Sequence, residues 1–192
     1  MRQSGRWKLG SAALALFVTV FPACGGNEIS PVGDNAIDQY SFKSLDEMVA
    51  TSDAVVEGTV VKVETGRTVG PTEAPLTFSQ VTLQVDAVLY GNLRTDPVLL
   101  EEDGTGYSYS ETGSHGVYFI TYKGAPEEPF YRLVSSAGRF IVSPSGTLEA
   151  SNDEPPWVVE IETLDLAALK ERVAEATLAI ERGEVKPAPP VL

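Results

Sequence analysis

The sequence predicts a mainly β domain: a small closed or half-open barrel of five to seven strands, with a short N-terminal helix and an amphipathic C-terminal helix. Residues 54–63 and 117–122 are dense in β-branched and aromatic residues, which is typical of central strands. Residues 78–89 alternate apolar and polar side chains, as half-buried strands do. Gly58 interrupts the first run, where a bulge or a sharp bend is expected. Bent strands of unequal length favour a barrel over a flat sheet.

A short helix is expected first, over residues 44–52. Ser44 is followed three residues later by Glu47, which is the spacing of a capping box. Asp46 adds a second negative charge near the positive end of the helix dipole. Both acids are therefore interpreted as helix-starting charges and not as catalytic groups. The apolar stripe behind them consists of Leu45, Met48 and Val49.

Strands and loops are expected to alternate after this helix. Glycine, proline and serine predict loops at residues 65–75 and 103–113, and residues 152–156 break the pattern again. The expected strands are residues 54–63, 78–89, 97–101, 117–122 and 131–135, followed by a hairpin of 139–142 with 147–149.

The C-terminal helix is predicted by apolar residues at helical spacing. Asp165 is the expected N-cap and Gly183 the expected residue after the C-cap. The opposite face is charged and is interpreted as solvated. The apolar positions are Leu166, Leu169, Val173, Ala176 and Ile180.

The first residues have the order of an export signal. Three cations, Arg2, Arg6 and Lys8, precede an apolar run. Residues 9–23 would form about 22 Å of helix, which is short for a hydrocarbon core of about 30 Å. We therefore expect a signal peptide over residues 1–23, a linker over 24–42, one domain over 43–183 and a disordered proline-rich tail over 184–192.

Cys24, the single cysteine, follows the expected cleavage point. The sequence Phe21-Pro22-Ala23-Cys24 resembles the bacterial lipobox, the cleavage signal of lipoproteins, although Phe21 stands where leucine is usual and Pro22 where a small residue is usual. The resemblance implies that diacylglycerol is joined to the Cys24 thiol and that the new amine is often acylated as well. The domain would then be anchored to the membrane and lie outside the cytoplasm. An ordinary secretory signal and an uncleaved anchor are the alternatives.

The charge balance argues against nucleic acid as a partner. The chain has 14 Lys and Arg against 27 Asp and Glu, a formal charge of −13. Removal of residues 1–23 takes away three cations and no acid, which changes this charge to −16. Nucleic-acid binding depends on contacts between cations and phosphates, which such a surface disfavours.

Three short segments carry a second resemblance. Ser52-Asp53-Ala54-Val55-Val56-Glu57-Gly58, Val88-Leu89-Tyr90-Gly91 and Gly116-Val117-Tyr118-Phe119-Ile120 follow one another in an order that resembles an OB-like barrel of uncharacterised bacterial lipoproteins. More remotely, the order is similar to the inhibitory domain of the tissue inhibitors of metalloproteinases. That family uses a free amino-terminal cysteine to ligate zinc. An acylated Cys24 could not do so, and the inhibitory mechanism is not carried over.

Catalytic and metal motifs are sparse. His115 is the only histidine, and the sequence holds no Gly-x-Ser-x-Gly elbow around which a triad could form. We expect a loop histidine without a special role, no metal site and no cofactor. The clusters at residues 101–103 and 152–154 offer oxygen ligands for calcium but lack EF-hand spacing, so they are interpreted as solvated acids.

Two functions from different classes remain. The first is a non-catalytic module that binds an extracytoplasmic protein, peptide or glycan. The second is an exported hydrolase that uses His115 or an acidic cluster. The absence of paired catalytic motifs favours the first. Tyrosines at strand ends and in the 103–113 loop are candidates for its binding rim, because barrels of this type bind partners there; the alternative is that they merely cover strand edges. The candidate binding residues are Tyr90, Tyr107, Tyr109 and Tyr122.

Overall fold

The computed structural model describes residues 40–73, 75–103, 110–125, 127–152 and 155–191. All of them belong to one compact unit, residues 33–192. In chain order the elements are α1 (Leu45–Thr51), β1 (Ala54–Val69), β2 (Leu76–Gly91), β3 (Val98–Asp103), β4 (His115–Tyr122), β5 (Tyr131–Leu133), β6 (Arg139–Val142), β7 (Leu148–Ala150), α2 (Pro156–Glu162) and α3 (Leu166–Glu181).

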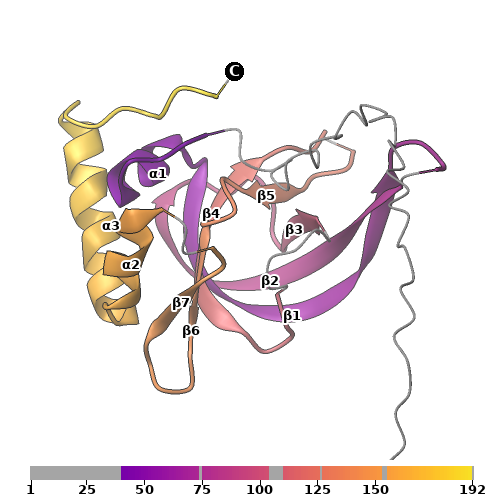
Figure 1. Ribbon diagram of the computed structural model, residues 1–192, viewed down its shortest axis with the longest axis horizontal. Helices are drawn as coiled ribbons and strands as arrows, with labels where there is room; N and C mark the ends of the chain where they lie inside the picture. Colours follow the sequence, from indigo (N-terminus) through magenta and orange to yellow (C-terminus); the bar gives the residue numbers. More distant parts are fainter. Residues whose placement is uncertain (1–39, 74, 104–109, 126, 153–154, 192) are drawn as a thin grey trace, which may run out of the picture. The chain divides into compact units, whose positions relative to one another are not determined.

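Five strands close into a barrel, and two more extend it. The strands β1, β2, β3, β5 and β4 are neighbours in that order, and β4 closes the circle by pairing with the first half of β1. The β3–β5 pair is parallel and the other pairs are antiparallel. The hairpin of β6 and β7 continues from β4. The prediction of a mainly β fold with a small barrel and short helices is confirmed (Figure 1).

Gly58 lies where β1 bends between its two partners. The register with β2 shifts between Glu57 and Gly58, as expected for a bulge. A Cβ at Gly58 would lie 2.6 Å from the carbonyl oxygen of Gln84, so only glycine permits this approach of the two backbones.

Two sequence-based expectations about element boundaries were wrong. β1 continues to Val69, so residues 65–69 are strand and not loop. Gly66 lies at a further register shift, between Thr65 and Thr68, and the hydroxyls of Thr68 and Thr77 are 2.9 Å apart across the strands. Residues 156–162 form α2, which the pattern did not predict. Pro156 fits there because the first helical turn needs no hydrogen bond from its nitrogen.

The first half of β1 and the centre of β4 are buried on both faces, and successive side chains point to opposite sides of a strand. Val56 and Tyr118 face the barrel interior. Val55 and Phe119 face outward and pack beneath the helices. Figure 1 shows the three helices together on one side of the barrel. This second core accounts for the nearly continuous apolar runs of the two strands.

The C-terminal segment returns to α1 after α3 ends. Ala188 is 6% exposed, and its backbone nitrogen donates to the Thr51 hydroxyl at 2.9 Å. Pro190 forms an antiparallel bridge with Tyr40. The structure thus has contacts here where the sequence predicts a disordered tail. Within the described residues, no helix combines the length and the apolar character needed to cross a membrane.

Candidate functional site

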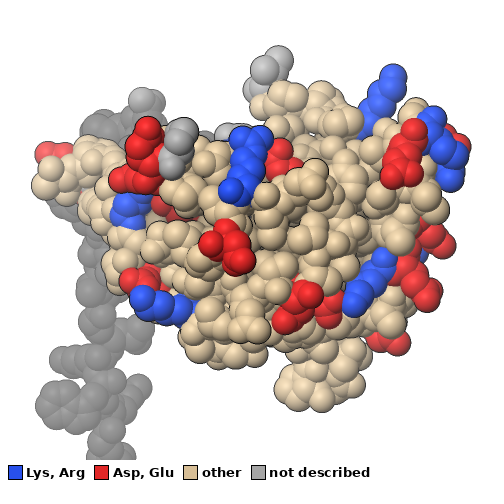
Figure 2. All heavy atoms as spheres, turned by 180° about the vertical axis from the view of Figure 1, so that it is seen from behind, with Lys and Arg blue, Asp and Glu red and all other residues tan. Residues whose placement is uncertain are grey.

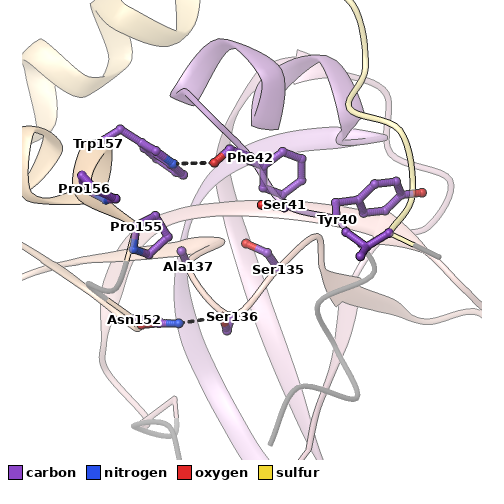
Figure 3. A pocket seen from close by; sticks show the side chains of 11 residues that line it. Tyr40, Ser41, Phe42, Ser135, Ser136, Ala137, Asn152, Pro155, Pro156 and Trp157 are labelled. Atoms are coloured by element: carbon purple, nitrogen blue, oxygen red, sulfur yellow. Dashed lines mark hydrogen bonds between the residues drawn. The ribbon is translucent and has the colours of Figure 1, made fainter. Parts of the chain in front are cut away.

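A pocket of about 440 Å³ lies where the first described residues meet the β5–β6 turn and the start of α2 (Figure 3). We call it the Trp157 pocket. Its volume lies within the range of about 300–1,000 Å³ that is usual for small-ligand sites. Its lining residues are Tyr40, Ser41, Phe42, Ser135, Ser136, Ala137, Asn152, Pro155, Pro156, Trp157 and Val191.

The aromatic wall of the Trp157 pocket is held by short-range and long-range contacts. The Trp157 indole nitrogen, in the first turn of α2, donates to the carbonyl oxygen of Phe42 at 3.0 Å. The rings of Tyr40 and Phe42 are stacked with their centroids 5.9 Å apart. A hydrogen bond across 115 residues of sequence therefore fixes the indole before any ligand arrives.

Polar groups on the other side of the Trp157 pocket come from the turn between β5 and β6. The Gly138 nitrogen donates to the Ser135 carbonyl at 2.9 Å, which closes the turn. The Asn152 amide donates to the Ser136 hydroxyl at 2.9 Å. Ser135 is 4% exposed, and its hydroxyl has no hydrogen-bond partner among the described residues. Figure 3 shows this hydroxyl turned toward the other lining residues.

The chemistry of the Trp157 pocket suits binding. Among the residues that the structure describes, those lining this pocket include no carboxylate, imidazole, amine or thiol. They supply aromatic and proline surface, three serine hydroxyls and one carboxamide, which donate and accept hydrogen bonds without carrying charge. Sequence reasoning missed this site. One available signal was Trp157, which is the single tryptophan after residue 23 and follows two prolines.

Two of the four predicted tyrosines lie at one end of the barrel. Tyr90 is the second-to-last residue of β2 and pairs with Val55, and Tyr122 is the last residue of β4. The Asp53 carboxylate lies at this end and accepts from the Tyr122 nitrogen at 2.8 Å. The guanidinium carbon of Arg94 lies 4.6 Å from the Tyr122 ring centroid. Tyr90 lines a smaller pocket of about 290 Å³ with Asp53 and Arg94. Tyr107 and Tyr109 lie outside the described residues.

His115 is the first residue of β4 and not a loop residue. Its Nε2 lies 3.5 Å from Glu57 Oε1 and 3.5 Å from Asp86 Oδ2. The other Glu57 oxygen accepts from the Lys170 ammonium at 2.6 Å. Both imidazole distances are long for a hydrogen bond, and His115 lines neither the Trp157 pocket nor the Tyr90 pocket. The arrangement joins β1, β2 and β4 on the outside of the barrel.

Glu101 and Glu102 are buried, although the sequence suggests solvated acids. Glu101 accepts from Arg67 Nε at 2.6 Å and from Arg132 Nη2 at 3.2 Å. The hydrogen bond to Glu101 raises the pKa of Arg67. Glu102 accepts from Arg139 at 2.6 Å. The described residues contain no group of three or more His, Cys, Asp or Glu that could hold a metal ion. The side chains of residues 103, 153 and 154 lie outside this description.

Charges of both signs share the surface. Figure 2 shows Lys and Arg beside Asp and Glu, with broad uncharged areas between them. Lys62 with Glu64 and Arg182 with Glu184 are exposed ion pairs that also bring the two signs together. The acidic excess is therefore not gathered into one patch on the face drawn there.

The predicted lipidation site, Cys24, lies outside the described residues. Comparison with protein-family models, with curated proteins and with solved structures gives no match to this chain. The resemblances to bacterial lipoproteins and to the tissue inhibitors of metalloproteinases therefore stay predictions.

Proposed function

We propose that the chain is an exported lipoprotein whose domain binds a partner outside the cytoplasm without transforming it. Lipid on Cys24 would anchor it to the membrane, and the partner would be a protein, a peptide or a glycan. The observation that carries the proposal is the Trp157 pocket, which combines a usual ligand-site volume with a fixed aromatic wall and uncharged hydrogen-bonding groups.

The alternative function, a hydrolase using His115 or an acidic cluster, has weaker support. A catalytic histidine is usually oriented by a third group within hydrogen-bond reach, about 2.6–3.2 Å. His115 lies 3.5 Å from both neighbouring carboxylates. Glu101 and Glu102 are each bound to arginine side chains. These contacts are the ones that structural ion pairs make.

Photo-cross-linking in intact cells tests the proposal. A benzophenone side chain at Ser41, which is exposed and lines the Trp157 pocket, should form an adduct with envelope material. Trp157→Ala should weaken this adduct. The same probe at Glu149, which is exposed on β7, is the control and should not form it. An absent adduct, or an identical one from both positions, would contradict binding at this pocket.

The same cells can separate the pocket from the tyrosine rim. Tyr107→Ala combined with Tyr109→Ala should leave the Ser41 adduct unchanged if the Trp157 pocket holds the partner. Loss of the adduct in this variant, with no effect of Trp157→Ala, would move the binding surface to the rim around Tyr90 and Tyr122.

A further inference from the structure

The Trp157 pocket has features that narrow the class of its ligand, given the binding function proposed above. The described residues that line it carry no charged side chain. A charged ligand would gain no opposite charge from these residues to offset its lost hydration, which is unfavourable. The described lining therefore favours an uncharged part of a ligand.

The two kinds of lining side chain match the two surfaces of a sugar ring. Trp157, which is half-buried, offers flat aromatic surface of the kind that packs against the C–H face of a pyranose. Serine hydroxyls and the Asn152 carboxamide donate and accept hydrogen bonds, as the hydroxyl belt of a sugar also does. We propose that the Trp157 pocket binds an uncharged sugar unit of a glycan, with one sugar face on the aromatic wall and one sugar hydroxyl bonded to Ser135.

The Ser135 hydroxyl is the observation that points to a ligand. Buried side-chain polar groups nearly always have a hydrogen-bond partner. Ser135 is 4% exposed, lines the pocket and has no partner among the described residues. A serine hydroxyl turns among three staggered positions about its Cα–Cβ bond, so it can reach an atom that enters the pocket. No described residue of the fold hydrogen-bonds to this hydroxyl.

The aromatic wall is also in place before binding. Trp157 is bound to the Phe42 carbonyl, and Phe42 is buried and stacked on Tyr40. A ligand therefore need not order these side chains, which lowers the entropic penalty of binding. A proline-rich peptide would use the same rings and also carries free backbone carbonyls that can accept from the Ser135 hydroxyl, so it is a separate outcome of the test.

Fluorescence of Trp157 provides the test. The full-length chain with Trp7→Phe retains Trp157 as its single indole. Titration with triacetylchitotriose, maltotriose and cellotriose at millimolar concentrations should give a saturable change with at least one of them. Ser135→Ala should weaken that binding about three- to tenfold, the worth of one hydrogen bond, without lowering the melting temperature.

Thr95→Val is the matched control. It removes another buried hydroxyl that has no partner among the described residues but does not line the Trp157 pocket. Its affinity for the sugar should equal that of the parent chain. Equal affinities of the parent and of Ser135→Ala would overturn the proposal.

A peptide arm separates this inference from the proposed function. A synthetic peptide with the sequence of residues 186–192 tests the alternative that the Trp157 pocket binds a proline-rich peptide. A response to this peptide with none to the three sugars would overturn the glycan assignment and leave a binding module. No response to either probe would also overturn it. If the Ser41 cross-link were absent as well, the proposed function would fail with it.

Discussion

Glu102 and Arg139 form an ion pair inside the domain, with Glu102 Oε1 and Arg139 Nη1 2.6 Å apart. Their side chains are 8% and 4% exposed. Ser110 joins them, because its nitrogen and its hydroxyl donate to Glu102 at 3.0 and 2.7 Å while the hydroxyl accepts from Arg139 at 2.7 Å. The pair connects β3 to β6, which is one of the two strands outside the closed barrel.

Glu102→Ala should therefore lower the free energy of unfolding by about 3–5 kcal/mol, because it removes the carboxylate that faces a buried guanidinium. Chemical denaturation at neutral pH measures the change. Glu64→Ala is the control: it breaks the exposed pair with Lys62 and should change stability by at most about 1 kcal/mol. The double variant Glu102→Leu with Arg139→Met should lose less than Glu102→Ala alone. Equal losses from Glu102→Ala and Glu64→Ala would contradict the buried pair.

The sequence predicted the strands better than it predicted the side-chain networks. Strand period is a local property, so the apolar runs around Val55 and Phe119 identify two barrel strands correctly. The partner of Glu102 is 37 residues away in sequence, and nothing near Glu102 distinguishes it from a solvated acid.

The candidate site was unpredictable for the same reason. The Trp157 pocket joins residues 40–42, 135–137 and 152–157 with Val191. No single stretch carries the pattern, and residues 152–156 looked only like a break between elements. Tyr90 and Tyr122, in contrast, lie near strand ends, which periodicity does define.

Removing the hydroxyl from either of two buried tyrosines in the barrel interior should change the stability of the domain in different ways. The Tyr118 hydroxyl has no hydrogen-bond partner among the described residues. The Tyr131 hydroxyl, in contrast, accepts a hydrogen bond from the backbone nitrogen of Arg94 at 2.6 Å. Tyr118→Phe should leave stability unchanged or raise it, and Tyr131→Phe should lower it by about 1 kcal/mol. Thermal and chemical unfolding measure both. A larger loss from Tyr118→Phe than from Tyr131→Phe would contradict these contacts.

The buried Tyr118 hydroxyl predicts that the domain loses stability at alkaline pH. Burial raises the pKa of Tyr118 above its ordinary value of about 10; Glu102 adds to the rise and Arg139 opposes it. Above pH 10 the unfolded chain therefore releases this proton and the folded chain retains it. Stability should fall by up to about 1.4 kcal/mol per pH unit from this group. Tyr118→Phe should show a shallower decline, and an identical decline in both proteins would assign the effect to other groups.

Gly58→Ala tests the close approach of β1 and β2. The added Cβ would lie 2.6 Å from the Gln84 carbonyl oxygen, so the two strands must move apart. We expect a loss of about 1–3 kcal/mol in unfolding free energy, as for other overpacked sites. Thr65→Ala, at an exposed position of the same strand, should stay within about 0.5 kcal/mol. A neutral Gly58→Ala would show that the bulge tolerates a side chain.

The anchor is tested at Cys24. If lipid on this thiol, together with an acylated amine, holds the protein, then Cys24→Ser removes every acyl chain and should move it from the membrane fraction to the soluble fraction. A single acyl chain binds a bilayer only marginally, whereas two or more anchor a protein stably, so the shift should be nearly complete. Fractionation followed by immunoblotting measures it, and Ser30→Ala in the expected linker is the matched control that should stay with the membrane. Mass spectrometry of the parent chain should find residue 24 at the new amino terminus and carrying acyl groups. Retention of Cys24→Ser in the membrane, or an unmodified Cys24 in the processed parent chain, would refute lipid anchoring while leaving the binding function of the Trp157 pocket open to its own tests.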